Sequence, residues 1–456
     1  MKNRVVANKA AWVVAGSVVY GHGIGGCTSG SSSSGANDSG SSGSAVGDSG
    51  SSDSGSSDSG SGDSAVIDSG SSDSAVIDSG SGRSGSSGEA SSACVPQTSQ
   101  CAGTGSVQIC GSDGQWGSPW TCATASCTDG ACTGSTTTGS SCETSGAGRT
   151  DCGSASGGSE SCCTSLEVPG GTFDRTYVEV GGGAEAGTDV ATVSGFRLDR
   201  YLVTVGRFRQ FVGFLSGGGS PPAGGTGKQA HLNGGKGLAN AATGTDYEIG
   251  WDAKDWNADV TSGPVAANTW NTNLASCAPY STWTPSVGAQ ENLPINCVDW
   301  YQAYAFCVWD GGFLPSEAEW EYAAAGGAQE RAYPWGSTDP GIDNQYAIYE
   351  CHYGSGDSGA CTGAINIAPV GRAPLGVGRW GQLDLAGNLW EWTLDWYAPY
   401  ASPCADCAYL SSSVYRVVRG GGYSTVASSL VPTYRSNNAH PFDPGLTVGF
   451  RCARTP

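Results

Sequence analysis

The sequence has little positive charge. It holds 21 Lys and Arg against 41 Asp and Glu in 456 residues, which gives a formal net charge of −20. Binding to nucleic acid depends on a basic patch that neutralises phosphates, so this composition argues against a nucleic-acid partner. The acidity is instead typical of a soluble chain, and it is compatible with cation binding.

Aromatic residues are absent between Thr28 and about Ser92, where the chain is almost entirely Ser, Gly and Asp. A short phrase recurs there and places an aspartate every five residues from Asp48 to Asp78. So few apolar side chains cannot offset a backbone entropy cost of about 1–2 kcal/mol per residue. We therefore expect residues 27–93 to form a disordered, extended linker.

The N-terminus has a basic start, a short apolar stretch and small residues before Cys27. The apolar stretch is too short to span a bilayer, which favours a cleaved export signal over residues 1–26. Ile24 to Cys27 resembles a bacterial lipobox, which implies lipidation of Cys27 and anchoring to a membrane. The alternative is an ordinary secretory signal with an unrelated cysteine.

The other eighteen cysteines fall into two even groups, ten in residues 94–163 and eight from Cys277 to Cys452. Even groups are expected of an exported protein with disulfides inside each part. Residues 94–163 have little apolar content, so we expect disulfides to stabilise this segment. Zinc is the competing use of close cysteines, but the segment has no histidine and no paired CxxC modules.

Residues 166–455 have the composition of a folded domain. Thr204 is a candidate N-cap for a helix with apolar residues at helical spacing. Asp299 with Gln302, and Ser316 with Glu319, form capping-box patterns, and Gly326 would end the second of these helices. We expect residues 217–287 to form long loops, and the helix from Trp300 to pack one face. These features predict an irregular α+β domain with little regular secondary structure.

Several phrases in this domain stand in a specific order. They are VPGGTF (168–173), FRLDRYLVTVGRFRQFV (196–212), LPSEAEWEYAAAGG (314–327), GQLDLAGNLWEWTLDWY (381–397), RVVRGGGY (416–423) and GFRCAR (449–454). Together they resemble the sulfatase-modifying factor family, to which the formylglycine-generating enzyme belongs. The resemblance implies a variant of the C-type lectin fold over residues 166–455.

The same resemblance draws attention to the stretch 420–435, which contains no cysteine. In the formylglycine-generating enzyme, two cysteines in this stretch bind copper and activate oxygen. Thr425 and Leu430 stand at those positions here. Because Cu(I) selects thiolate ligands, neither side chain can replace a cysteine, and copper is not expected.

Iron-dependent relatives use paired histidines with a carboxylate, but no HxxxHxE pattern occurs. His231, His352 and His440 stand apart in the sequence. This leaves a binding or scaffold role as the preferred function, with an aromatic groove beside the loop. Its candidate lining residues are Trp390, Trp392, Trp396, Tyr423 and Arg435, for which core packing is the alternative. A glycan, a peptide or another envelope component would be the ligand.

The resemblance also implies one structural calcium ion, held at Asp384, Gly387, Leu389 and Glu391. Carboxylate and carbonyl oxygens suit Ca²⁺, although surface ion pairs are an alternative use of the two acids. A second calcium site of the family begins with an asparagine where this chain has Ile348, so the resemblance does not carry that site over.

The resemblance further implies a disulfide between Cys307 and Cys452. A second family disulfide would need cysteines at Ala324 and Ser436, and both are absent. The remaining six cysteines could pair locally, for example Cys351 with Cys361 and Cys404 with Cys407. Two other functions stay open: a related oxidase that uses different metal ligands, and a purely structural envelope protein.

Overall fold

The computed structural model describes residues 99–456 except residues 104, 110–114, 117–119, 122–126, 129–130, 133–134, 138, 154–159, 181–182, 186–188, 258–259, 261–266 and 356–358. The predicted signal peptide, Cys27 and the predicted linker lie outside the described residues. Among the helices that are described, none combines the length and the apolar character needed to cross a membrane.

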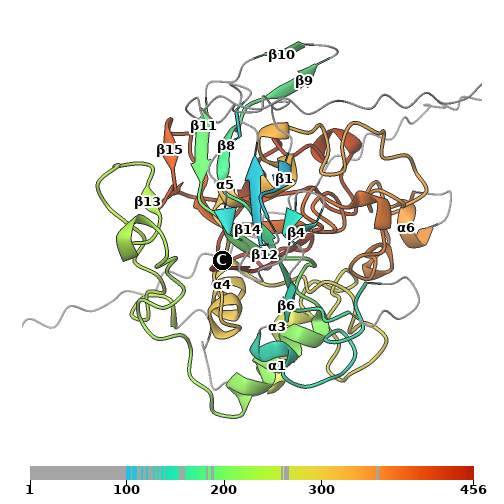
Figure 1. The fold of residues 1–456 in the computed structure, drawn as a ribbon. Coiled ribbons are helices and arrows are strands. Elements are labelled where there is room, and N and C mark those ends of the chain that lie inside the picture. Colours follow the sequence, from blue (N-terminus) through green and yellow to red (C-terminus); the bar gives the residue numbers. More distant parts are fainter. Residues whose placement is uncertain are drawn as a thin grey trace, which may run out of the picture. The chain divides into compact units, whose positions relative to one another are not determined.

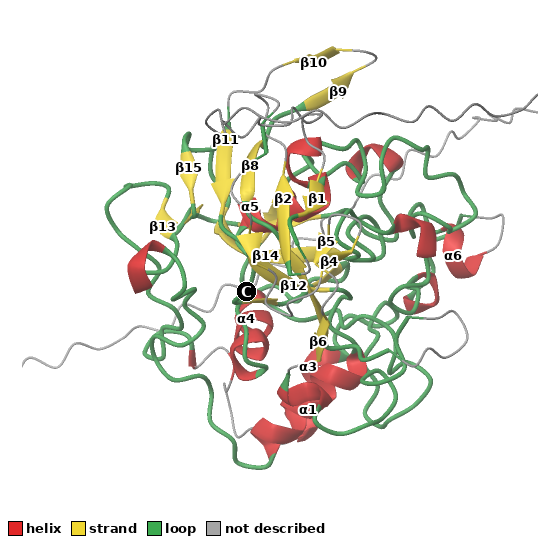
Figure 2. Ribbon diagram, viewed as in Figure 1, coloured by secondary structure: helices red, strands yellow, loops and turns green. Residues whose placement is uncertain are grey.

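Helices make up a small part of the described chain, and loops connect most of the elements (Figure 2). The α-helices are α1 (Val205–Ser216), α3 (Ala267–Leu274), α4 (Trp300–Trp309), α5 (Glu317–Ala325) and the single turn α6 (His352–Ser355). The 3-10 turns are η1 (Ser140–Cys142), η2 (Asn233–Gly235), η3 (Gly327–Gln329), η5 (Ala364–Asn366), η6 (Pro374–Gly376) and η7 (Ala427–Ser429).

The three predicted helix starts are confirmed. Thr204 caps α1, and its hydroxyl accepts a hydrogen bond from Arg207 N. Full capping boxes begin α4 at Asp299 and α5 at Ser316. Gly326 ends α5 in the left-handed conformation, as predicted.

One expectation about the helices is incomplete and another is wrong. The predicted apolar face of the helix from Trp300 is buried, but so is every other residue from Trp300 to Cys307. The stretch 217–287 contains α3, which was predicted as loop. Trp270 and Leu274 of α3 lie one turn apart and are both buried, so tertiary packing stabilises this helix. The other residues of α3 are mostly polar and show no apolar helical period.

Two four-stranded sheets carry the domain, one containing β12 and the other β14, both of which are labelled in Figure 1. The first has the order β20 (Ala453–Arg454), β12 (Phe196–Asp199), β7 (Thr164–Val168) and β6 (Ser135–Thr137). The second has the order β18 (Ser436–Ala439), β17 (Arg416–Arg419), β14 (Trp390–Trp396) and β19 (Val448–Gly449). In both sheets the last residues of the chain pair with much earlier segments, so the C-terminus closes the domain.

The remaining strands form small sheets. Three strands pair in the order β15 (Cys404–Ala405), β11 (Val190–Val193) and β8 (Gly171–Asp174), and three more in the order β1 (Ser99–Cys101), β2 (Ser106–Ile109) and β3 (Trp120–Thr121). Two-stranded pairs are β9 (Val178–Val180) with β10 (Gly183–Glu185), β13 (Ala239–Asn240) with β16 (Cys407–Ala408), and β4 (Cys127–Thr128) with β5 (Ala131–Cys132). This mixture of short strands and few helices confirms the α+β class.

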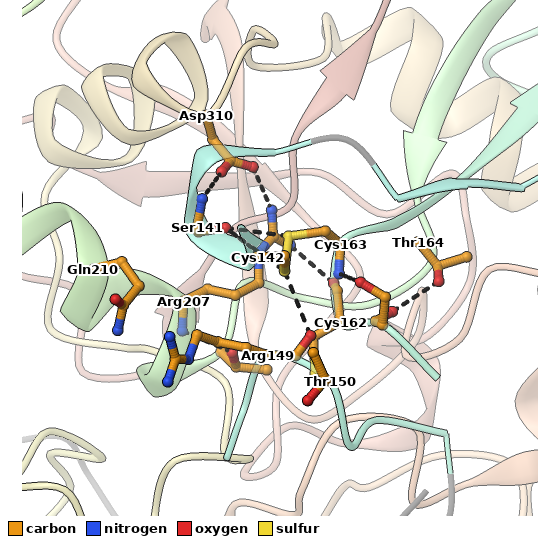
Figure 3. Close-up of a disulfide and its surroundings, with 12 residues drawn as sticks. Ser141, Cys142, Arg149, Thr150, Cys162, Cys163, Thr164, Arg207, Gln210 and Asp310 are labelled. Carbon is orange, nitrogen blue, oxygen red and sulfur yellow. Dashed lines mark hydrogen bonds and ion pairs between the residues drawn. A yellow bond between two sulfur atoms is a disulfide. The ribbon is translucent and has the colours of Figure 1, made fainter. Parts of the chain in front are cut away.

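The end of the cysteine-rich segment packs into the domain. Strand β6 pairs with β7, and disulfides join Cys142 to Cys163 and Cys152 to Cys162. Figure 3 shows Ser141 beside the Cys142–Cys163 disulfide, with Asp310 and Arg207 next to it. The described residues between 135 and 163 therefore contribute to the same folded unit as the residues that follow them.

A buried ionic cluster, Asp199, Arg207, Asp310 and Arg454, fixes this junction. Arg207 lies 3.0 Å from Asp199 and 2.7 Å from Asp310, and Arg454 lies 2.6 Å from Asp310. Ser141 N donates to Asp310 Oδ1 at 2.7 Å. Burial alone would raise the pKa of Asp310, but the two arginines and the Ser141 N–H hold it below its ordinary value.

Disulfides also clamp the rest of the domain. The structure joins Cys307 of α4 to Cys452 beside β20, the pairing that the resemblance implies. It also joins Cys351 to Cys361 and Cys404 to Cys407, and in addition Cys277 to Cys297. All eight cysteines from Cys277 onward are thus bonded within the domain, which is typical of proteins that fold in an oxidising environment.

Candidate functional site

The cysteine-free loop, residues 420–435, connects β17 to β18. The arginines that flank its start and form its end, Arg419 and Arg435, both bind Glu317 of α5. Arg435 forms a bidentate pair, with Nε and Nη2 lying 2.6 and 2.7 Å from the two carboxylate oxygens. Arg419 also lies 2.6 Å from Glu321 and donates to the carbonyl of Pro432 inside the loop.

Charge balance explains this arrangement. Burial alone would raise the pKa of Glu317, but Arg419 and Arg435 lower it below its ordinary value. Burial would likewise lower the pKa of Arg419, but Glu321, Tyr400 and Glu317 raise it instead. Glu317 is therefore ionised, and its pairs with Arg419 and Arg435 anchor the two ends of the loop to one helix. Burial raises the pKa of Glu321 to about 8, although Arg419 opposes this increase.

The two copper positions lie close together inside this loop. A Cβ atom placed on Gly421 would come within 3.1 Å of both Thr425 Oγ1 and Leu430 Cδ2. The Thr425 hydroxyl accepts a hydrogen bond from Gly422 N and donates one to Gly422 O, so it stabilises the turn. Leu430 is buried among apolar residues that include Tyr349 and Ala386. The convergence fits a pair of ligands, but a structural hydroxyl and an isobutyl group do not fit Cu(I).

The groove candidates are largely buried. Tyr423 is 2 % exposed and stacks on Tyr280 with ring centroids 6.5 Å apart. Trp390 is 8 % exposed and lies beside Tyr434, while Trp392 donates from its indole to Val298 O. Arg435 is bound to Glu317 and to the carbonyl of Ala398. These positions are better explained by packing around the loop than by an open groove.

Of the residues predicted to hold calcium, Asp384, Gly387 and Leu389 lie in the turn that leads into β14, and Glu391 lies in β14 itself. Asp384 Oδ2 accepts a hydrogen bond from Gly371 N at 2.6 Å. Burial raises the pKa of Asp384 to about 6, and the nearby Glu391 adds to this increase. A cation bound to Asp384 would oppose that effect, and the carbonyl groups of Gly387 and Leu389 follow directly in the chain.

Glu391 has a different main partner. Arg451 donates from Nε and Nη2 to its two oxygens, each at 2.7 Å, and the Trp320 indole donates to Oε2 at 2.9 Å. All three side chains are buried. Glu391 therefore holds the last strands to α5. Of the two carboxylates predicted to bind calcium, only Asp384 forms no ion pair among the described residues.

The three described histidines, His231, His352 and His440, have separate surroundings. His231 stacks on Phe313, His352 lies 3.4 Å from Glu350, and His440 contacts Phe442. No cluster of three or more His, Cys, Asp or Glu side chains suited to a metal ion exists in the described part of the chain. The paired-histidine arrangement of an iron site is therefore not present among these residues.

A cavity of about 240 Å³ lies away from the loop, between β14, β17, α4 and the segment 240–256. Its walls include Trp256, Trp300, Tyr304 and Trp396, and its polar residues include Glu248 and Arg416. The Arg416 guanidinium lies between two indoles, 3.5 Å from the ring centre of Trp300 and 3.7 Å from that of Trp396. Trp396 is one of the predicted groove residues, but no motif pointed to this cavity as a whole, because its walls come from separate segments of the chain.

Comparisons with known proteins identify the same family as the motifs in the sequence. The model of the sulfatase-modifying factor enzyme 1-like domain matches residues 155–456. A formylglycine-generating enzyme of Streptomyces coelicolor is 35% identical over 211 residues, which are 43% of this chain and 64% of that protein. An inactive Cα-formylglycine-generating enzyme 2 of Mus musculus is 34% identical over 176 residues, 37% of this chain and 52% of that protein.

A hercynine oxygenase of Mycolicibacterium smegmatis is 28% identical over 312 residues, 64% of this chain and 61% of that protein. The matched region thus spans less than two thirds of each of these relatives. The family model, in contrast, covers more than half of the present chain and includes the loop, the calcium positions and the C-terminal strands. The chain belongs to the sulfatase-modifying factor family.

Proposed function

We propose that this domain is a binding or scaffold member of the family and does not catalyse copper-dependent formylglycine formation. One observation carries the proposal: the two positions that converge at Gly421 hold Thr425 and Leu430, and both side chains already have structural roles. The similarity to a relative named as inactive supports the same conclusion.

Restoring the thiols tests this proposal. We expect the Thr425→Cys/Leu430→Cys variant to take one equivalent of Cu(I) from a chromophoric chelator under anaerobic conditions, because its two sulfurs would face each other across Gly421. The wild type and the matched Thr425→Ser/Leu430→Ile variant should take none. A wild-type protein that binds one equivalent, or that oxidises the cysteine of a CxPxR peptide with oxygen, would overturn the proposal.

We also propose that a structural calcium ion binds at Asp384 with the carbonyl groups of Gly387 and Leu389. The expected result is a higher melting temperature of the wild type in calcium than in chelator. Asp384→Ala should remove this difference, whereas Asp384→Asn should keep part of it because the amide oxygen can still bind calcium. Equal melting temperatures of the wild type in the two conditions would contradict the calcium proposal.

Glu391 is not suitable for the same test. Its removal would leave Arg451 buried without its carboxylate, so the domain should lose stability with or without calcium.

Export and lipid anchoring through Cys27 complete the proposal. The disulfides of the domain support export, since they form in oxidising compartments. The lipobox-like sequence before Cys27 supports the anchor. A labelled fatty acid should be incorporated by the wild type and not by Cys27→Ser, and equal labelling of both would refute the anchor.

A further inference from the structure

The cation at the Arg416 cavity lacks the ion pair that most buried arginines have. Five of the other six buried arginines have carboxylate partners within 4.0 Å, namely Arg197, Arg207, Arg419, Arg451 and Arg454. The sixth, Arg175, donates hydrogen bonds from Nε and Nη2 to the carbonyls of Asp189 and Ala401. Arg416 is 3 % exposed and has no such ion pair with any described residue. A buried cation without a countercharge costs several kcal/mol, which two stacked indoles offset only in part.

The hydrogen bonds of Arg416 are also incomplete. Nη1 donates to the carbonyl of Leu394 at 2.7 Å. Nε is buried and has no hydrogen-bond partner among the described residues. The nearby Asp395 forms no ion pair with Arg416, and its two oxygens accept hydrogen bonds from the backbone N–H groups of Glu317 and Tyr409.

Burial lowers the pKa of Arg416 to about 9, although Tyr301, Asp395 and Tyr304 oppose this decrease. A negatively charged group in the cavity would therefore be stabilised by pairing with the guanidinium. Planar, two-pronged donors such as guanidinium match the geometry of a carboxylate.

A second polar group faces the same cavity. Glu248 is 5 % exposed, and its Oε2 accepts hydrogen bonds from Gln229 N and Leu238 N. Its Oε1 is buried without a hydrogen-bond partner among the described residues. Burial raises the pKa of Glu248 to about 7. This carboxyl group could therefore bond to a hydroxyl or amino group of a ligand.

We propose that this cavity binds a small organic monocarboxylate, with Arg416 pairing with the carboxylate and the aromatic walls packing on a ring-shaped body. One guanidinium near two acidic residues, Asp246 and Glu248, fits a single negative charge better than a phosphate dianion. The volume of about 240 Å³ suits a molecule with one ring. The site uses no residue of the loop 420–435, so it goes beyond the proposed loss of copper chemistry and does not depend on it.

The test compares charged and neutral probes of the same shape. Benzoate with benzamide represents an aromatic acid, and glucuronate with glucose represents a sugar acid. We expect one of the acids to bind the calcium-loaded, disulfide-intact protein saturably, with quenching of tryptophan fluorescence, and at least tenfold more tightly than its neutral counterpart. The pair that shows this difference identifies the kind of ring.

Variants separate the role of Arg416 from a general effect. Arg416→Met should weaken binding of the acid at least tenfold and leave the weak binding of the neutral probe unchanged. Arg416→Lys should bind with intermediate affinity, and the exposed control Arg372→Met should behave as the wild type. If neither acid binds the wild type more tightly than its neutral counterpart, or if Arg416→Met binds the acid normally, the proposal is wrong. The probe comparison on the wild type remains decisive even if a variant fails to fold.

Discussion

Replacing Arg419 with methionine should lower the free energy of unfolding of the domain by about 3–5 kcal/mol. The guanidinium contacts Glu317 and Glu321, each at 2.6 Å, and its side chain is completely buried. Methionine would fill much of the space but would leave Glu321 without its cation and Glu317 with one partner instead of two. Urea denaturation followed by circular dichroism measures this loss.

Two variants serve as controls for Arg419. Arg435→Met should cost less, because its side chain is 13 % exposed and Glu317 would retain Arg419. Adding Glu321→Gln to Arg419→Met should recover part of the stability at pH values above about 8, the raised pKa of Glu321, because a neutral amide costs less to bury than a carboxylate. Surface substitutions usually change the free energy of unfolding by no more than about 0.5 kcal/mol. If the free energy of unfolding of Arg419→Met lies within that range of the wild-type value, the cluster does not anchor the loop.

Removing the disulfide between Cys307 and Cys452 by replacing both residues with alanine should cost about 4–5 kcal/mol. The two cysteines are 145 residues apart in the sequence, so the bond restricts the unfolded chain strongly. Both side chains are completely buried, which adds a small loss of packing. Thermal and urea denaturation under oxidising conditions would report the difference.

The disulfide between Cys404 and Cys407 provides a matched comparison. These residues are separated by only three positions, so their replacement by alanine should cost less than half as much. Equal losses for the two double variants would show that the effect of the long-range disulfide does not come from chain entropy.

Local patterns predicted the starts of α1, α4 and α5, because a cap and its first turn depend on residues only three positions apart. The helix α3 could not be predicted in this way. Its stability comes from the burial of Trp270 and Leu274 against distant parts of the chain, and its own sequence is polar. For the same reason, the sequence did not show that Ser141 would bond to Asp310.

Some residues of the candidate site could likewise be predicted from the sequence, and others could not. Motif order located Thr425, Leu430 and Asp384, and the structure brings the first two together. Arg435 was expected to line a groove, but it pairs with Glu317, which is 118 residues earlier. Such a partner cannot be inferred without the fold. The Arg416 cavity was not predicted, although Arg416 and Trp396 belong to two of the recognised phrases, because its walls come from several elements that only the fold brings together.

The shared attachment of Arg419 and Arg435 to Glu317 has an evolutionary consequence. Because Arg419 and Arg435 bind the same carboxylate of Glu317, the two ends of the loop between them are held in place whatever residues the loop contains. Substitutions at 425 and 430 can then gain or lose reactivity while the surrounding architecture persists. Two members of such a family can therefore share the fold of this loop without sharing a catalytic activity.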